Sequence, residues 1–330
     1  MTSAMKQNVL ITGGSGFLGT HMGRRLSENY SIVLGDRINE GGRLGKTPAA
    51  CTAITLDVTN IESVRDACKK FKPSIVIHAA GTKFVDLAER HPFECVDVNV
   101  VGSENVAKVA METDVETVIG LSTVIAAPPI RNTYGLSKAM MERMFCASDG
   151  KTNTKFVCVR YGNVAWSTGS VLAIWKQMFN DCKVIGTTGP EMRRFFLTVK
   201  EAVELVLTAI TRVDRVHGKV LAREMKVAQI SDLLNVWTET LGGEWVRIAG
   251  RRGEGNDEYL VGEIELAYAE RLVLDKVNHY LIAFNQLSPV PLTEVVSSAN
   301  AQRFSKEEML RIIMDPPSEE LVLKLSPFET

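Results

Sequence analysis

The 330-residue sequence predicts an α/β fold, a doubly wound parallel sheet with a smaller C-terminal cap. Short apolar runs alternate with amphipathic helical runs through the first half of the chain. A glycine-rich turn follows the first apolar run, and the alternation loosens beyond about residue 163. We therefore expect a first domain over residues 1–165. Residues 166–330 are expected to form mostly the cap, with some crossover segments returning to the first domain.

The expected elements follow one another in a regular order. Short apolar runs bounded by turn residues predict strands over 8–12, 31–35, 52–56, 74–79, 116–121 and 156–161. Apolar positions at helical spacing predict helices over 19–29, 61–71, 92–113 and 134–148. Later helices are predicted over 171–181, 201–213, 230–241 and 305–314, with 263–276 helical or mixed. Parallel strands joined by helices form a sheet that is covered on both faces.

Composition excludes several classes of protein. Hydrophobic residues make up 45% and charged residues 23%, as in ordinary globular domains. A formal net charge of -1 gives no reason to expect a nucleic-acid or membrane-surface partner. No apolar run reaches the ~18 residues of a membrane span. Six scattered cysteines without Cys-x-x-Cys spacing are expected to be free thiols, so we expect a cytoplasmic protein without a metal site.

The glycine-rich turn predicts a dinucleotide site. Gly13, Gly16 and Gly19 are spaced G-x-x-G-x-x-G between the first strand and the first helix. Glycines there allow a tight turn and the close approach of a pyrophosphate, which binds at the positive helix end. Asp36 ends the second strand, where a carboxylate binds the ribose of NAD, while Arg37 suits the 2′-phosphate of NADP. The first domain is therefore predicted to be Rossmann-like, with NAD favoured and NADP possible.

Tyr134 and Lys138 form a Tyr-x-x-x-Lys pair on one face of a predicted helix. A lysine ammonium beside a phenol favours the phenolate, so the tyrosine can act as a base near neutral pH. A base beside a bound nicotinamide interconverts an alcohol and a ketone. We therefore predict that this pair carries a redox step.

Residues at later strand ends are candidates for the same site. Asp57 and Val58 follow the third strand and are predicted to contact the adenine, with a plain turn as the alternative. Small residues after His78 let the backbone pass beneath the cofactor, whereas His78 itself is expected to be structural. Asn99 is a poor helix former in mid-helix, and we expect it to hold a water or backbone group near Lys138. The full set of predicted cofactor contacts is Gly13, Gly16, Phe17, Leu18, Gly19, Asp36, Arg37, Asp57, Val58, Ala79, Ala80, Gly81, Asn99, Tyr134 and Lys138.

Positive side chains indicate where a phosphorylated substrate would bind. Lys83 lies just beyond the fourth strand and is expected to reach the substrate, unless it faces solvent. Two arginine pairs, Arg193-Arg194 and Arg251-Arg252, lie in the second half of the chain. Guanidinium groups bind phosphate bidentately, so these pairs suit a diphosphate, and solvated surface charge is the alternative.

With these motifs in place, the sequence resembles the extended short-chain dehydrogenase/reductases. Within them it is similar to the bacterial polysaccharide-biosynthesis group of UDP-N-acetylglucosamine 4,6-dehydratases and related epimerases. The resemblance rests on GGSGFLG at 13–19, HAAGTKFVDLAERHPFECVDVNVVGSENV at 78–106, YGLSK at 134–138, RYGNVAWSTGSV at 160–171, PEMRRFFLTVKEAVELVL at 190–207 and SSANAQRFSKEEM at 297–309. It covers almost the whole chain.

The resemblance implies a role for individual residues. Thr123 would orient the reacting sugar hydroxyl, Tyr134 would be the base and Lys138 its partner. The substrate contacts that it implies are Asn163, Ser170, Val171, Arg194, Arg251 and Glu254, beside the Lys83 named above. The expected substrate is a nucleotide sugar, UDP-linked as in UDP-GlcNAc, and a homo-oligomer is expected.

Two departures from the family pattern limit the reaction. The dehydratases carry an Asp-Lys pair directly after the Ser/Thr, where this chain has Val124 and Ile125. The arginine of the group is Thr168 here, and its motif R-P-G-E-K-L-H reads RRGEGND over 251–257. The redox half of the site is therefore intact, and the elimination half is missing. We expect an epimerase or oxidoreductase acting at sugar C4 in glycan precursor synthesis. The alternatives are a 4,6-dehydratase that uses Lys83 and a silent dinucleotide-binding regulator.

Overall fold

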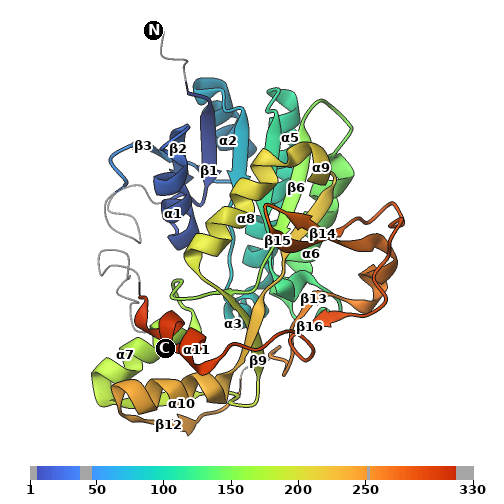
Figure 1. Cartoon of the computed structure of the whole chain (residues 1–330). Helices are drawn as coiled ribbons and strands as arrows, with labels where there is room; N and C mark the ends of the chain where they lie inside the picture. Colours follow the sequence, from blue (N-terminus) through green and yellow to red (C-terminus); the bar gives the residue numbers. More distant parts are fainter. Residues whose placement is uncertain (1–5, 38–46, 251–252, 317–330) are drawn as a thin grey trace.

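The computed structural model describes residues 6–37, 47–250 and 253–316. Its centre is a nine-stranded sheet with the order β14-β15-β10-β6-β5-β4-β1-β2-β3 (Figure 1). The strands from β3 to β10 pair in parallel, and β15 and β14 add an antiparallel edge. The nine strands are β1 (Asn8–Thr12), β2 (Ser31–Asp36), β3 (Cys51–Thr55), β4 (Ile75–His78), β5 (Thr117–Leu121), β6 (Lys155–Arg160), β10 (Lys219–Arg223), β14 (Ala269–Leu274) and β15 (Val277–Ile282).

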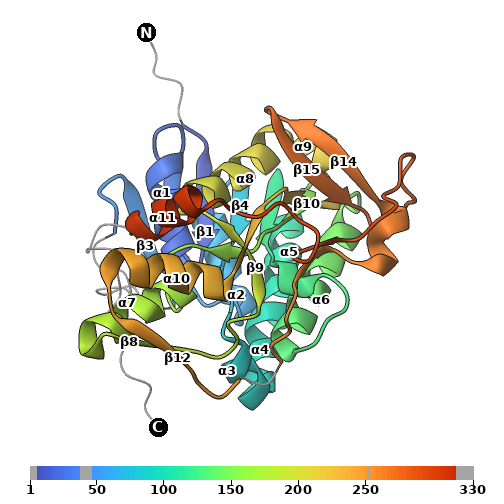
Figure 2. The ribbon, with the colours of Figure 1, turned by 60° about the horizontal axis from the view of Figure 1, so that its bottom comes forward.

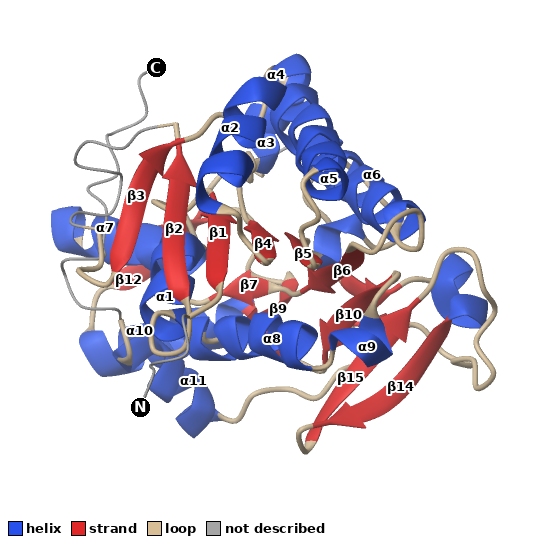
Figure 3. Cartoon of the chain, turned by 90° about the horizontal axis from the view of Figure 1, so that it is seen from above, coloured by secondary structure: helices blue, strands red, loops and turns tan. Residues whose placement is uncertain are grey.

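Helices cover both faces of this sheet (Figure 3), so the predicted doubly wound α/β fold is confirmed. One face carries α1 (Phe17–Leu26), α8 (Val199–Thr211) and α9 (Val213–Val216). The other carries α2 (Ile61–Phe71), α5 (Gly102–Glu112) and α6 (Thr133–Ser148). The central strands β4 and β5 are buried along their whole length, as expected of parallel strands between two helix layers.

The cap lies at one end of the sheet (Figures 1 and 2). Its helices are α7 (Val171–Cys182), α10 (Ile230–Leu241) and α11 (Lys306–Met314). Its strands are β7 (Asn163–Val164), β8 (Val184–Thr187), β9 (Arg193–Leu197), β11 (Lys226–Gln229), β12 (Glu244–Arg247), β13 (Tyr259–Val261) and β16 (Val296–Ser297). A second hydrophobic core, with Trp166, Trp175 and Trp237 at its centre, holds the three helices together. The half of the chain assigned to the cap also returns three strands, β10, β14 and β15, to the main sheet.

One predicted element combines two kinds of secondary structure. Residues 263–276, expected to be helical or mixed, form a short 3-10 helix (η3, Glu263–Tyr268) and then strand β14. Asp275 and Lys276 connect β14 to β15 with positive φ angles of 50° and 66°. Two left-handed residues make the tight turn that antiparallel strands need, but glycine usually marks it. Without a glycine the hairpin had no signal in the sequence.

The predicted helix over 92–113 is present but irregular. It divides into α4 (Pro92–Val96), a π-helical turn (η1, Asp97–Val101) and α5. A π turn inserts an extra residue and commonly lies at a functional site. A short helix that the sequence did not indicate, α3 (Val85–Arg90), precedes it. Among the described residues, no helix combines the length and the apolar character needed to cross a bilayer.

Candidate active site

The glycine turn is packed so tightly that side chains are excluded from it. A Cβ on Gly13 would lie 2.7 Å from the backbone nitrogen of Ala80, and one on Gly19 would lie 2.5 Å from the Gly13 carbonyl oxygen. Gly13 also has a φ of 66°, which favours glycine. The turn therefore brings the start of α1 against the loop that follows β4.

Gly16 is the N-cap of α1 and gives the helix no side-chain cap. The first N–H groups of a helix need an acceptor, and their positive potential favours an anion. A Cβ on Gly16 would approach only the Gly13 oxygen, at 3.1 Å, so the space above the turn is free of close neighbours. Phe17 and Leu18 begin the helix here. This cradle fits a pyrophosphate.

Asp36 ends β2 beside this turn. Its Oδ2 accepts hydrogen bonds from the Ser15 hydroxyl at 2.5 Å and the Ser15 N–H at 3.2 Å, and its Oδ1 accepts from the Arg37 N–H at 2.8 Å. Ser15 was not among the predicted site residues, although it lies inside the glycine motif. The carboxylate is thus fixed where a ribose hydroxyl would bind, and it would repel a 2′-phosphate.

Asp57 and Val58 serve the local structure. Asp57 Oδ1 accepts hydrogen bonds from the N–H and the hydroxyl of Thr59, at 2.9 and 2.8 Å. Val58 is buried against α5, and its carbonyl accepts from the Asn105 amide at 2.9 Å. β3 ends at Thr55, so both residues lie in the turn beyond it. Both residues therefore take part in the turn beyond β3, and their contact with adenine stays a prediction.

His78 lies at the end of β4 in a buried polar chain. Its two ring nitrogens contact the hydroxyls of Thr12, at 2.8 Å, and Ser103, at 3.0 Å. Burial, with a smaller effect from the charge of Lys138, lowers the pKa of His78 to about 3. A neutral ring with both nitrogens bonded fits the structural role predicted for it.

Asn99 connects the loop after β4 to helix α6. Its Oδ1 accepts from the Thr82 N–H at 2.9 Å, and its Nδ2 donates to the Thr82 carbonyl at 3.0 Å and to the Ser137 hydroxyl at 2.9 Å. Gly81 lies beside Lys138, because a Cβ there would be 3.2 Å from the lysine Nζ. Asn99 therefore holds a backbone group near Lys138, one of the two options expected from the sequence.

Tyr134 and Thr123 meet at the ends of α6 and β5. The hydroxyl of Tyr134 is hydrogen-bonded to the Thr123 side chain, which lowers the phenol pKa. Burial outweighs that effect, and the pKa of Tyr134 lies well above its ordinary value. Lys138, also buried, donates from Nζ to the Leu121 carbonyl at 3.0 Å. The Lys138 ammonium is therefore bound to a backbone oxygen and not to the Tyr134 hydroxyl. The expected lowering of the Tyr134 pKa by Lys138 is not present in this state.

Burial also acts on Lys138. Loss of water lowers its pKa to about 8, while Glu142 and two nearby thiols partly oppose that change. A buried lysine that titrates near neutrality is typical of functional sites, although structural networks also perturb pKa values. Tyr134 is therefore neutral near pH 7, whereas Lys138, with a pKa of about 8, still carries its proton for most of the time.

Val124 and Ile125 form a 3-10 turn (η2, Val124–Ala126) directly after Thr123. Val124 is buried in the main core, and Ile125 packs in a small cluster with Tyr134. Gly135 lies against this turn, because a Cβ there would be 2.5 Å from the Ile125 carbonyl oxygen. Aliphatic side chains fill this position beside the tyrosine.

The cap side of the site consists of charged side chains bound to one another. Arg193 donates from Nε and Nη2 to the two carboxylate oxygens of Asp257, both at 2.7 Å. Arg194 donates to the carbonyl of Gly255 at 2.9 Å and lies 3.5 Å from Glu258. Both arginines therefore bind the segment over 253–258, Arg193 through its ion pair with Asp257 and Arg194 through the Gly255 carbonyl and Glu258.

Asn163 and Glu258 connect the two sides. Asn163 Nδ2 donates to both carboxylate oxygens of Glu258 at 3.2 Å, and the Phe195 N–H donates to Glu258 at 3.1 Å. Burial raises the pKa of Glu258, while Arg194 lowers it. The sequence did not single out Glu258, because its partners Asn163 and Phe195 are distant along the chain.

The remaining substrate candidates lie around the start of α7. Ser170 is the N-cap of α7, and its buried Oγ has no hydrogen-bond partner in the part of the chain that the structure describes. Val171 packs against the cap core. Lys83 is exposed, yet protein surrounds it enough for desolvation to lower its pKa to about 8. Gly169 lies against Phe84, because a Cβ there would be 2.4 Å from that ring, so the two loops face each other.

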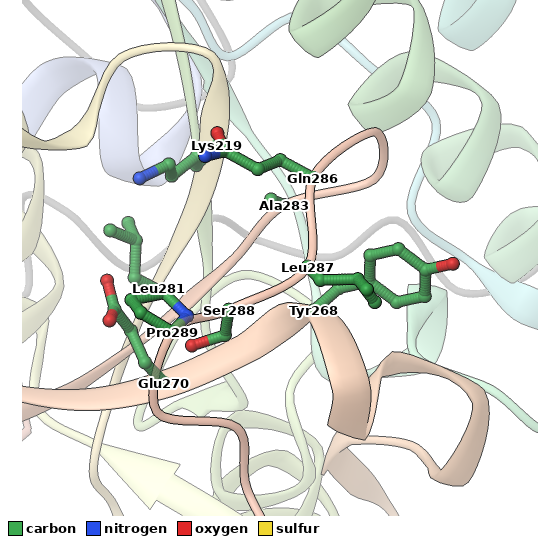
Figure 4. Close-up of a pocket in the computed structure, with 9 residues that line it drawn as sticks. All are labelled: Lys219, Tyr268, Glu270, Leu281, Ala283, Gln286, Leu287, Ser288 and Pro289. Atoms are coloured by element: carbon green, nitrogen blue, oxygen red, sulfur yellow. The ribbon is translucent and has the colours of Figure 1, made fainter.

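Two predicted substrate contacts, Arg251 and Glu254, remain. Arg251 lies outside the described residues. Glu254 is half-buried and follows Gly253, whose carbonyl accepts from the Asn132 amide at 3.3 Å. This loop therefore reaches the N-cap of the catalytic helix. In contrast, a shallow pocket between β10, β14 and β15 contains none of the predicted site residues (Figure 4).

Comparisons with known proteins give the family. A family model described as "Polysaccharide biosynthesis protein" matches residues 9–274. A UDP-N-acetylglucosamine 4,6-dehydratase (inverting) of Campylobacter jejuni is 31% identical over 80% of this chain and 82% of that protein. A UDP-glucose 4-epimerase of Rickettsia bellii is 30% identical over 94% of this chain and 96% of that protein.

A solved structure agrees with these relatives. The X-ray structure of Pen from Bacillus thuringiensis has a TM-score of 0.83 and 27% identity, and covers 94% of this chain and 97% of that chain. The family match, the relatives and this fold confirm the resemblance drawn from the motifs. The chain belongs to the polysaccharide biosynthesis protein family, in the epimerase and dehydratase group of the extended short-chain dehydrogenase/reductases.

Proposed function

We propose that this chain is an NAD-dependent enzyme that oxidises C4 of a UDP-linked sugar and acts as a C4 epimerase or oxidoreductase. The observation that carries the proposal is the contrast between Thr123–Tyr134, which are hydrogen-bonded, and Ile125, which packs beside them as an aliphatic side chain. A hydroxyl proton has an acceptor there, whereas a C6 leaving group has no donor on η2. Relatives named as an epimerase and a dehydratase support the choice of substrate class.

The residues of the cradle fit a dinucleotide. The N–H groups at the start of α1 would bind the pyrophosphate, and Asp36 would accept hydrogen bonds from a ribose hydroxyl. Asp36 favours NAD over NADP. Solved structures with the same fold but under 25% identity include a UDP-glucose 4-epimerase in complex with NAD. When bound, the nicotinamide would supply the hydride acceptor and donor for a carbon of the sugar.

The chain's own residues would then handle protons and position the sugar. As the phenolate, Tyr134 would accept the C4 hydroxyl proton, and Thr123, whose side chain meets the Tyr134 hydroxyl, would orient that sugar hydroxyl. Lys138 supplies the positive charge that stabilises the phenolate once it releases the Leu121 carbonyl. Arg194, Asn163 and Ser170 are proposed to bind the nucleotide diphosphate.

Incubation of UDP-GlcNAc with the protein and NAD in D2O, followed by NMR, tests this function. An epimerase gives a C4 epimer without solvent deuterium, because only hydride and the hydroxyl proton move. A dehydratase gives a 6-methyl signal and deuterium at C5, because elimination exchanges that proton. Rapid formation of a 6-deoxy-4-keto sugar would contradict the proposal. Tight NAD binding without turnover of any UDP-sugar would favour the silent regulator.

One observation favours the dehydratase as the second candidate. Desolvation lowers the pKa of Lys83 to about 8, so this residue can exchange a proton near neutral pH. It lies on the loop after β4 that faces the start of α7. If NMR shows elimination, Lys83→Met should abolish it, while Tyr134→Phe should abolish the oxidation that precedes it.

We also propose that the protein acts in the cytoplasm as a homo-oligomer that makes glycan precursors. The neighbouring helices α4 and α6 expose large apolar side chains, with Phe93 85% and Leu136 59% exposed. Apolar groups at this density on packed helices favour burial against a second copy. Light scattering after gel filtration should give a multiple of the 36.3 kDa chain mass, and Leu136→Glu should reduce it. A monomeric parent would contradict this proposal.

A further inference from the structure

A buried charge cluster lies directly behind the catalytic helix. Arg160, in β6, is fully buried. Its Nε and Nη2 donate to the two carboxylate oxygens of Glu142, at 3.0 and 2.6 Å. Its Nη1 and Nη2 donate to the two carboxylate oxygens of Glu265, both at 2.9 Å. One guanidinium therefore binds two carboxylates that are themselves buried, from α6 and from η3.

This triad fixes two parts of the active site. Glu142 lies one turn beyond Lys138 on α6, so the two side chains share a face of the helix. Its Oε1 also accepts a hydrogen bond from the Ser122 hydroxyl at 2.6 Å, and Ser122 directly precedes Thr123. Glu142 thus holds both the helix that carries Tyr134 and the turn that carries Thr123.

Glu265 connects the triad to the cap side of the site. The segment over 255–265, which we call the strap, contacts Arg194 at its first residue and Arg160 at its last. Between them, the Leu260 carbonyl accepts from Arg160 at 2.9 Å. A Cβ on Gly262 would lie 2.1 Å from the Pro128 carbonyl oxygen, so the strap is packed against the loop after Thr123.

The charges of the triad do not cancel. Two carboxylates against one guanidinium leave an excess negative charge in a dry interior, where a nearby cation is its natural partner. Lys138 is such a cation, and Cys158, Cys95 and Glu142, in that order, raise its pKa against the effect of burial. The two thiols belong to Cys158 in β6 and Cys95 in α4, and His78 in β4 also lies near enough for the charge of Lys138 to lower its pKa. His78 is neutral at working pH, burial raises the pKa of the Cys158 thiol, and the Cys95 thiol donates to the Ser137 hydroxyl at 3.5 Å. Among these groups, Glu142 is therefore the charged neighbour.

We propose that Arg160, Glu142 and Glu265 are positioning residues, which join the strap to Thr123 and Lys138, and that the Glu142 carboxylate is the charge partner of Lys138 on the shared face of α6. Binding of the nucleotide by Arg194 would then change the position of the turn that carries Thr123, because the strap runs from Arg194 to Arg160 without a break. The proposal depends on the proposed function only where it gives Lys138 a part in turnover.

Two matched substitutions test the electrostatic step without any substrate. Glu142→Gln and Glu265→Gln each remove one negative charge from the same guanidinium, but only Glu142 acts on Lys138. The titration of the Lys138 side chain is followed by NMR of its Nζ, assigned with Lys138→Arg. The midpoint should fall by about one pH unit in Glu142→Gln, the smallest shift typical of a close opposite charge, and should stay unchanged in Glu265→Gln. Equal shifts in both variants, or none in either, would overturn the proposal.

A variant with an uncharged triad keeps the test valid if the single substitutions prevent folding. Replacement of Arg160 by Met together with Glu142→Gln and Glu265→Gln removes all three charges, and such replacements are often tolerated in a core. The Lys138 midpoint should fall in this variant as well, and an unchanged midpoint would count against the proposal.

Turnover then tests the positioning step. Glu265→Gln should lower kcat for the UDP-sugar by about tenfold and leave the NAD Kd unchanged, while Glu265→Asp should restore part of the loss. A normal kcat in folded Glu265→Gln would overturn the role of the strap. If the parent shows no turnover, the proposed function fails, and the NMR titration still decides the role of Glu142.

Discussion

The two sides of the candidate site are held in different ways. On the dinucleotide side, small residues and backbone groups pack at contact distance, as where Gly13 meets Ala80. On the cap side, charged side chains hold one another, as in the bidentate Arg193–Asp257 pair. Close packing of backbone tolerates no added atom, whereas an exchange of charged partners can preserve a salt bridge. The dinucleotide side should therefore tolerate few substitutions, whereas substitutions on the cap side should change which substrate is preferred.

The catalytic pair lies between these two sides and should show the largest effect. Tyr134→Phe keeps the ring and removes the proton acceptor, so turnover of a UDP-sugar should fall by about 10²–10⁴-fold. Folding and NAD affinity should hold, because the hydroxyl contacts only the Thr123 side chain among the bonds described for it. The measurement is kcat with calorimetric NAD binding as the control. Unchanged turnover would show that the Tyr-x-x-x-Lys match is accidental.

The strictness of the dinucleotide side is tested at Gly16. A Cβ there would lie 3.1 Å from the Gly13 oxygen, so Gly16→Val can fold with a small adjustment, but its side chain would occupy the pyrophosphate cradle. NAD affinity should fall by about 10–100-fold, the loss of charge-assisted hydrogen bonds worth roughly 1.5–3 kcal/mol. Gly250→Val is the matched control, because a Cβ at Gly250 would meet nothing within 4 Å. Equal NAD affinity in both variants would refute the cradle.

Local patterns made the dinucleotide side predictable. The glycine spacing, Asp36 and the Tyr134–Lys138 pair each depend on residues close in sequence to a strand end, so a motif reveals them. The cap side depends on pairs that no local pattern links, such as Asn163 with Glu258. The same reason explains the missed hairpin at Asp275, whose turn lacks the usual glycine. The phenolate expected at Tyr134 is absent because burial raises the pKa of the phenol, and the extent of burial cannot be read from the sequence.

A fall in pH should change the free energy of unfolding in opposite directions through His78, on the dinucleotide side, and Glu258, on the cap side. His78 has a folded pKa of about 3, below the ordinary 6.5, so its contribution to stability is present above pH 6.5 and is lost as pH falls toward 3. Between pH 6.5 and 5 this loss is about 2 kcal/mol. On the cap side, burial raises the pKa of Glu258, so protonation is easier in the folded state and acid relieves a cost.

Urea unfolding at pH 6.5 and 5 measures this difference. His78→Gln should remove most of the acid-induced loss in the free energy of unfolding, because an amide does not titrate. Glu258→Gln should leave that loss intact or deepen it. His91→Gln, at an exposed position, is the control. An acid response in His78→Gln equal to that of the parent would place the sensitive group elsewhere.

The smallest effect is expected at the Arg193–Asp257 pair, which is partly exposed, with side-chain exposures of 29% and 21%. The pair fixes the segment whose Gly255 carbonyl binds Arg194, and the Ser298 hydroxyl adds a hydrogen bond to Asp257 at 2.8 Å. Arg193→Met should therefore loosen Arg194 without touching the dinucleotide cradle. We expect KM for a UDP-sugar to rise by about tenfold, or ~1.4 kcal/mol, with NAD affinity unchanged.

A double-mutant cycle with Asp257→Asn decides whether the pair acts as a unit. If it does, the double variant should bind the UDP-sugar no worse than Arg193→Met alone, because the first substitution has already released the segment. Arg247→Met breaks the exposed pair with Glu191 and is the matched control, for which no change in KM is expected. Additive losses would mean that Arg193 and Asp257 contact the substrate separately. The cap side would then be a set of independent contacts. It would differ from the closely packed dinucleotide side only in the charge of its side chains, and not in how its residues depend on one another.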